Sequence, residues 1–155
     1  MNTLATIDLP DEAATRELGA RLAQILSIGD VVALLGDLGA GKTTLARGLI
    51  QSVLGENEPV PSPTFTLVQT YEREEEAASI YHFDLYRLSH PEELVELGWE
   101  DAFSTGISLV EWPERAGDSL PETALWLELL EHGEGRRATF SGSSDWTKRL
   151  QGFLH

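Results

Sequence analysis

The sequence has 155 residues, the size of one globular domain, and its 41% hydrophobic content excludes a chain that is disordered throughout. It contains no cysteine, which excludes disulfides, thiolate metal sites and a cysteine nucleophile. The formal net charge is −15, so nonspecific association with nucleic acid or anionic lipid is disfavoured. The acidity serves solubility or forms a docking face for a basic partner, and a phosphate ligand would need a dedicated pocket or a metal ion.

The first predicted elements are a helix, a strand and a second helix. Apolar residues at 18, 22, 25 and 26 recur at helical spacing after Pro10, and this helix is expected to end at residues 29–30. Residues 31–35 form a continuous apolar run, which is typical of a strand buried on both faces. A second helix is predicted from Lys42 to Gly55.

The second half of the chain predicts two hairpins separated by a short helix and a buried strand. Residues 66–71 and 79–84 read as antiparallel strands joined by an acidic tip. Ser89 and Glu92 match a capping box before a helix that should run to about Gly98. The later expected elements are a buried strand at 107–112, a hairpin of residues 125–131 and 137–141, and a weak terminal helix at 146–154. This order predicts an α/β fold with a mixed central sheet.

No segment suggests a membrane or secretory destination. The longest apolar run, residues 31–35, is far below the roughly 20 residues that a membrane helix needs. The N-terminus lacks a basic region followed by an apolar one. We therefore expect a cytoplasmic location without membrane contact.

Residues 36–43, GDLGAGKT, fit the phosphate-binding pattern G-x-x-x-x-G-K-[ST]. The glycines let backbone N–H groups curl around an anion, and the following helix adds its positive dipole end. Lys42 is placed to reach the β- and γ-phosphates of a nucleotide, and the Thr43 hydroxyl is placed to bind Mg²⁺. The predicted strand before the loop and helix after it argue against an incidental glycine-rich turn.

Two carboxylates end apolar runs, where an idle charge would be costly. We expect Glu111 to face Mg²⁺, directly or through water; the alternative is an ion pair with Arg87 or Arg115. We expect Asp84 to orient the attacking water or to help hold the metal. The alternative for Asp84 is a cap on residues 85–89.

Other candidates are open to two interpretations. Residues 61–66, PSPTFT, could sense the γ-phosphate or form a plain turn before a strand. Trp112 in a regular strand would point away from the preceding carboxylate, so we interpret it as a core or interface residue rather than an adenine-stacking one. His82 is interpreted as a sheet residue rather than a base. Arg136 and Arg137 could lie near the nucleotide or line a hairpin.

The segments GDLGAGKTT, SPTFTLVQTY, YHFDLYRL, HPEELVELG and LVEWPE occur in this order. With them, the chain resembles the TsaE family, the small bacterial ATPases of tRNA threonylcarbamoyladenosine synthesis, from about Leu9 to Ser141. The resemblance implies a P-loop NTPase-like three-layer fold with a mixed, parallel and antiparallel, central sheet. Residues 1–141 would form the P-loop ATPase domain, and residues 142–155 a tail with a short helix packed on it.

The resemblance also implies an activity and partners. The family binds Mg-ATP and hydrolyses it slowly alone, and it works with a TsaD-like transferase and its TsaB-like paralogue. Together they place a threonylcarbamoyl group on adenosine 37 of tRNAs that read ANN codons. Because this chain is strongly acidic, we expect tRNA contact mainly through the partners, with hydrolysis resetting the complex between rounds.

Carried onto matching positions, the resemblance assigns the site. Lys42, Asp84 and Glu111 become the catalytic residues, and Thr43, Glu111 and Asp84 the metal side. It also suggests that Thr15, Gly135 and Arg136 lie near the adenine. The residues expected to contact the nucleotide are Thr15, Asp37, Leu38, Gly39, Ala40, Gly41, Lys42, Thr43, Thr44, Thr64, Gly135 and Arg136.

Two other functions share the phosphate-binding loop. A small-molecule kinase often carries an arginine-bearing lid, and the sequence has no arginine-rich insertion. A nucleotide-dependent binding switch with negligible hydrolysis stays open because no arginine finger is evident. A GTPase version would need N-K-x-D, which the sequence lacks.

Overall fold

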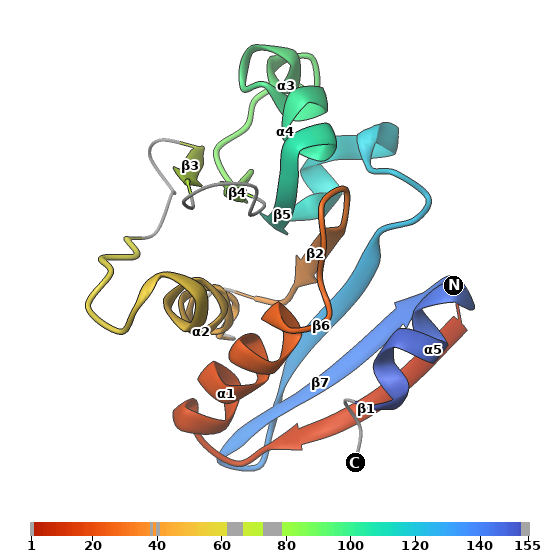
Figure 1. Cartoon of the computed structure of the whole chain (residues 1–155). Helices are drawn as coiled ribbons and strands as arrows, with labels where there is room; N and C mark the ends of the chain where they lie inside the picture. Colours follow the sequence, from red (N-terminus) through yellow and green to blue (C-terminus); the bar gives the residue numbers. More distant parts are fainter. Residues whose placement is uncertain (1, 38, 40, 62–66, 73–78, 153–155) are drawn as a thin grey trace.

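The computed structural model describes residues 2–37, 39, 41–61, 67–72 and 79–152, and these form one seven-stranded sheet with helices on both faces (Figure 1). The strands are β1 (Asn2–Leu9), β2 (Val31–Leu35), β3 (Val68–Tyr71), β4 (Ser79–Asp84), β5 (Gly106–Glu111), β6 (Leu125–His132) and β7 (Gly135–Gly142). The helices are α1 (Glu12–Ala23), α2 (Lys42–Leu54), α3 (Glu93–Glu96), α4 (Trp99–Thr105), the 3₁₀ helix η1 (Pro113–Ser119) and α5 (Asp145–Gln151).

The sheet has a parallel centre and antiparallel edges. Its strand order is β1-β7-β6-β2-β5-β4-β3, and β6, β2, β5 and β4 run parallel to one another. At one edge β3 pairs antiparallel with β4, and at the other β7 pairs antiparallel with both β6 and β1. The predicted mixed sheet and both predicted hairpin pairings are therefore confirmed. The carboxyl ends of the parallel strands β2, β5 and β4 lie side by side at the same end of the sheet. This is the end at which α/β folds bind ligands.

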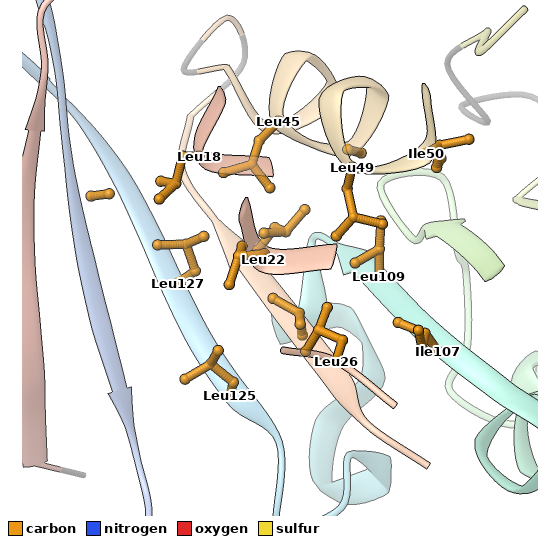
Figure 2. Close-up of a cluster of buried hydrophobic side chains, with 14 of the residues drawn as sticks. Leu18, Leu22, Leu26, Leu45, Leu49, Ile50, Ile107, Leu109, Leu125 and Leu127 are labelled. Atoms are coloured by element: carbon orange, nitrogen blue, oxygen red, sulfur yellow. The ribbon is translucent and has the colours of Figure 1, made fainter. Parts of the chain in front are cut away.

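One face of the sheet is covered by α1 and α2, which lie next to each other, with α5 in the same apolar cluster (Figure 1). Figure 2 shows leucine side chains of both helices gathered over the central strands. Leu22, Leu45 and Leu49 are fully buried there, as their helical spacing predicts. At the start of α1, the Asp11 carboxylate accepts a hydrogen bond from the Ala14 N–H at 2.8 Å, which caps the helix.

The opposite face is covered by α3, α4 and η1 over the β5–β4 half of the sheet. Phe83 of β4 packs edge-on against Trp99 of α4, with ring centroids 4.8 Å apart. Val110 of β5 and Leu94 of α3 are buried in the same cluster. Two helical layers therefore enclose the mixed sheet, and the α/β, P-loop NTPase-like three-layer fold is confirmed.

Several local features differ from what the sequence predicts. β1 was not predicted, and α1 ends at Ala23 rather than at residues 29–30. Between α1 and β2 the chain makes a turn in which the Ser27 N–H donates to the Asp30 carboxylate at 2.7 Å. This side-chain acceptor offers the backbone an alternative to further helical turns.

The predicted capping box is wrong. α3 starts at Glu93, and Ser89 makes no side-chain cap: the first turn is closed by backbone bonds from Glu93 to His90 and from Leu94 to Pro91. A second helix, α4, follows after Gly98, whose φ of 75° breaks the helical path.

The terminal helix forms where it was predicted and is shorter, as α5 ends at Gln151. Trp146 and Leu150 are buried in the first apolar cluster. Arg149 lies 2.5 Å from the Asp30 carboxylate and stacks over the Trp146 ring. In the described part of the chain, no helix has both the length and the apolar character needed to cross a membrane.

Candidate nucleotide-binding site

The phosphate-binding loop connects the end of β2 to the start of α2. Gly39 has a φ of 81° and Gly41 a φ of 105°, conformations that side-chain-bearing residues rarely adopt. The Gly41 carbonyl accepts the first helical bond of α2, from the Leu45 N–H at 2.9 Å. The positive φ angles of Gly39 and Gly41 therefore let the loop turn directly into the N-terminus of α2. Asp37 is exposed in this loop, and Leu38, Ala40 and Thr64 lie outside the described residues.

Lys42 begins α2 and its side chain is only 4% exposed. Its Nζ donates to the Gly36 carbonyl at 2.5 Å and lies 3.7 Å from the centroid of the Trp112 ring. Burial lowers the pKa of Lys42, and nearby carboxylates oppose this shift. Those carboxylates are Glu111, Glu114, Asp84 and Asp37. These carboxylates favour the cationic form of the buried lysine.

Thr43 and Glu111, the residues expected on the metal side, lie in contact with each other. The Thr43 Oγ1 lies 3.2 and 3.1 Å from the two Glu111 carboxylate oxygens, and Glu111 is 3% exposed. Two adjacent ligands of an octahedral Mg²⁺, each about 2.1 Å from the metal, lie about 3 Å apart. The pair therefore fits Mg²⁺ in both oxygen chemistry and spacing. No cluster of three or more metal-binding side chains occurs among the described residues.

His82 also belongs to this cluster. Its Nε2 lies 2.6 Å from Glu111 Oε2, and its side chain is 0% exposed. It is a sheet residue, as interpreted from the sequence, and it contacts the site as well. The signal that could have found it is its position two residues before Asp84, because a strand repeats its facing every second residue.

Asp84 ends β4 directly opposite Glu111 in the parallel β4–β5 register, and it is 4% exposed. Its Oδ1 accepts a hydrogen bond from the Tyr86 N–H at 3.0 Å. The alternative role as a cap on residues 85–89 is therefore present in the structure. The same residue lies beside Glu111 and near Lys42, so the cap and a role in the site are compatible.

Trp112 packs against the core, as interpreted from the sequence, but it does not lie in a regular strand. β5 ends at Glu111, and Trp112 takes φ 58° and ψ 50°, the left-handed region. Its ring packs partly against the second apolar cluster, 4.9 Å from Tyr86, and partly over Lys42. The assumption of a regular strand was wrong here, and a residue read as core or interface also contacts the phosphate-loop lysine.

A pocket of about 290 Å³ adjoins the loop. It lies between the loop, the start of α1 and the β6–β7 turn, and its lining residues are Asp11, Glu12, Thr15, Gly39, Gly41, Thr44, Glu134, Gly135 and Arg136. Arg136 donates to the Gly39 carbonyl at 2.9 Å and so joins the hairpin to the loop. The structure thus gathers in one pocket Thr15, Gly135 and Arg136, the residues that the resemblance expects near the adenine.

The neighbouring Arg137 lines the hairpin, the second of the two positions that the sequence left open for these arginines. It pairs with Asp8 of β1 at 2.8 Å and contacts His132, so it lines the edge of the sheet. This hydrogen bond lowers the pKa of the Asp8 carboxyl. The two adjacent arginines are therefore divided between the pocket and the hairpin.

Comparisons with known proteins agree with this geometry. The family model described as "Threonylcarbamoyl adenosine biosynthesis protein TsaE" matches residues 9–139. Two similar proteins, each named "tRNA threonylcarbamoyladenosine biosynthesis protein TsaE", come from Rickettsia felis and Haemophilus influenzae. The first is 42% identical over 139 residues, covering 88% of this chain and 80% of the relative. The second is 39% identical over 148 residues, covering 92% of each.

A solved structure shares the architecture. The crystal structure of YdiB from a Bacillus superposes with a TM-score of 0.76 at 25% identity, covering 99% of this chain and 96% of that one. The family match spans the phosphate loop, both strand-end carboxylates and the pocket arginine. On these grounds the chain belongs to the TsaE family.

Proposed function

We propose that this chain binds and hydrolyses Mg-ATP as the ATPase subunit for N6-threonylcarbamoylation of adenosine 37 in tRNAs that read ANN codons. The observation that carries the proposal is the convergence of Lys42, Thr43 and Glu111 at the carboxyl ends of β2 and β5. The neighbouring pocket is placed to take the base of a nucleotide whose phosphates lie on the loop. The names of the relatives supply the pathway.

Each residue has a role that follows from its place. Thr43 and Glu111 would hold Mg²⁺, which when bound neutralises charge on the β- and γ-phosphates. Lys42 would exchange its bond to the Gly36 carbonyl for phosphate oxygens, a short move for a lysine already anchored at the helix N-terminus. Arg136 and Thr15 would contact the adenosine end. The loop N–H groups and the α2 dipole would bind the anion where the acidic surface could not.

Asp84 would orient the attacking water. Its bond to the Tyr86 N–H fixes the carboxylate, and its register partner is Glu111 on the metal side. Asp84→Asn separates this role from capping, because the amide oxygen can still accept from Tyr86 while the charge is lost. We expect nearly unchanged stability and hydrolysis reduced about a hundredfold or more, the range typical of general-base groups. Equal loss of stability and activity would favour the cap alone.

The net charge of −15 shapes the proposed partners. We propose a cytoplasmic complex with a TsaD-like transferase and its TsaB-like paralogue, in which tRNA contacts mainly the partners. The transfer itself would occur on the transferase, and ATP hydrolysis here would reset the complex between rounds. An electrophoretic shift of tRNA by the isolated chain at physiological salt would contradict this division.

The test is steady-state ATP hydrolysis with and without the two partners, together with Mg-nucleotide affinity. Glu111→Ala removes the metal-side carboxylate, and Glu122→Ala, an exposed acid before β6, removes the same charge away from the site. Loss of partner-stimulated turnover in Glu111→Ala alone supports the proposal. Unchanged turnover in that variant refutes the role of Glu111.

Two further outcomes would identify the other functions. Tight ATP binding without turnover under any condition would favour a binding switch. ATP consumption only in the presence of a small-molecule acceptor would favour a kinase.

A further inference from the structure

The contact between His82 and Glu111 joins two neighbouring parallel strands on the diagonal. His82 pairs with Leu109 in the β4–β5 register, and Glu111 pairs with Asp84, two positions further along. Leu109 and Ile80 are buried in the cluster beneath α2, and side chains two positions apart on a strand share a face. His82 and Glu111 therefore both face the side of the sheet on which α2 presents Thr43.

The hydrogen-bonding partners of His82 show which residue donates in its contact with Glu111. His82 is 0% exposed, its Nε2 lies 2.6 Å from Glu111 Oε2, and its Nδ1 has no partner among the described residues. A neutral imidazole carries one N–H, and a carboxylate only accepts. A hydrogen on Nδ1 would be a buried donor without an acceptor, which is costly. The proton therefore belongs on Nε2, and His82 donates to Glu111.

Glu111 is thus held by two donors of different kinds. The Thr43 hydroxyl, 3.1 Å away, is itself a ligand-facing group at the helix N-terminus. His82 is enclosed in the sheet and contacts the carboxylate from the protein interior. A hydrogen bond between a charged and a neutral group is stronger than one between two neutral groups, so it can select one orientation of a carboxylate.

We propose that His82 is a positioning residue that holds the Glu111 carboxylate against Thr43, so that the Mg²⁺ side of the site is formed before the nucleotide binds. This inference rests on the proposed nucleotide-binding function. It assigns His82 no contact with the nucleotide and no proton transfer. Its consequence is specific: loss of the His82 donor weakens the contribution of Mg²⁺ to nucleotide affinity and leaves Mg²⁺-free affinity unchanged.

Two amide substitutions separate a donor from a mere space-filling residue. In His82→Gln the side-chain N–H₂ occupies about the place of Nε2 and can still reach Glu111. In His82→Asn the amide is one methylene shorter, so the donor falls near the place of Nδ1 and cannot reach. Ser108→Ala is the matched control, because Ser108 is 0% exposed on β5 and its hydroxyl has no partner in the described part of the chain.

The experiment measures ADP and ATP affinity by isothermal titration calorimetry with Mg²⁺ and with EDTA, for the full chain and each variant. The readout is the factor by which Mg²⁺ tightens binding. We expect His82→Asn to reduce this factor about tenfold, equivalent to about 1.4 kcal/mol. His82→Gln should stay within about threefold of the parent chain, and Ser108→Ala should match it. In a Glu111→Ala background, His82→Asn should have no further effect, as expected for residues that act through one another.

A folded His82→Asn variant that keeps the full Mg²⁺ factor would overturn the inference. So would a His82→Asn effect that simply adds to that of Glu111→Ala, because it would show a structural role independent of the carboxylate. If His82→Asn does not fold, His82→Gln decides: loss of the Mg²⁺ factor in that folded donor-bearing variant would refute the positioning role. A parent chain that binds no nucleotide at all would instead refute the proposed function on which the inference rests.

Discussion

The closest backbone approach on the α1–α2 face involves two glycines, and it makes a sharp test of the fold. A Cβ added to Gly48 would overlap the Arg16 carbonyl and lie 2.8 Å from its carbonyl carbon and from the Arg16 Cα. On the partner helix, a Cβ on Gly19 would overlap the Leu45 carbonyl and lie 2.9 Å from the Leu49 nitrogen. Each helix therefore presents a glycine to the other's backbone, and both obstacles are rigid main chain rather than side chains that could turn away.

The expected cost of Gly48→Ala follows from two opposing terms. Alanine in a helix interior gains about 1 kcal/mol over glycine in intrinsic propensity. Against this, an added Cβ overlaps the Arg16 carbonyl oxygen, and because such a contact needs a separation above about 3 Å, the helices must move apart by roughly 1 Å. Overpacking of this kind costs about 1–3 kcal/mol, and the separation also loosens the leucine contacts beneath both helices. We expect a net loss of about 1–2 kcal/mol in the free energy of unfolding.

Urea denaturation at 25 °C measures this loss. With an m-value of about 2 kcal/mol/M, the midpoint should fall by roughly 0.5–1 M. Gly152→Ala is the matched control, because that glycine lies at a φ of −70° and an added Cβ meets nothing within 4 Å from the other described residues. Its midpoint should stay the same or rise slightly. A Gly48→Ala variant as stable as the parent chain would refute the argument that these helices require a glycine at their contact.

The remaining predictions concern the pocket arginine, two tyrosines and the arginine of α5. Arg136→Ala, which removes the bridge to the phosphate loop, should weaken ADP and ATP binding by about tenfold with and without Mg²⁺ in calorimetry, whereas Arg137→Ala should not. Tyr71→Phe should be neutral or stabilising by up to about 1 kcal/mol in urea at pH 7, because the buried Tyr71 hydroxyl has no partner in the described ranges. Tyr81→Phe, which loses a 2.8 Å bond, should instead cost about 0.5–1.5 kcal/mol. Burial also raises the pKa of Tyr71, so the unfolded chain loses this proton first and stability should fall above about pH 10, a fall that Tyr71→Phe should reduce. Arg149→Ala should lower the unfolding free energy by about 1–3 kcal/mol, because it removes the partly buried ion pair that ties α5 to the turn before β2; an unchanged urea midpoint would contradict this.

Local sequence signals predicted much of the sheet and both long helices. β2 and α2 were predictable because an apolar run, a glycine loop and a helical repeat lie next to one another in the chain. β1 was not, because it is an edge strand that pairs only with β7, at the other end of the sequence. An edge strand with one exposed side buries little surface and carries a weak local signal. Its position depends on a partner that sequence proximity does not reveal.

The part of the candidate site that lies at the ends of the parallel strands could be predicted from the sequence. Glu111 and Asp84 could be expected near Lys42 because the carboxyl ends of neighbouring parallel strands meet at one edge. The sequence left two roles open for Arg136, and only the family resemblance favoured the one near the nucleotide, since no spacing rule relates a C-terminal hairpin to a loop about a hundred residues earlier. Strand alternation puts His82 on the same face as Asp84, but its contact with Glu111 required the actual register, because that contact runs diagonally between strands.

Trp112 shows why alternation fails at a strand end. In a regular strand Trp112 would point to the other face of the sheet from Glu111. However, β5 ends at Glu111, and Trp112 takes a φ of 58° just before Pro113. A non-glycine residue in this region is strained by about 1–3 kcal/mol, so surrounding contacts must hold it. Here the indole ring lies against Tyr86 on one side and 3.7 Å from the Lys42 Nζ on another. The strained backbone at Trp112 thus brings the indole ring from the core to the phosphate-loop lysine. The cation–π contact with this buried cation offsets part of the strain energy.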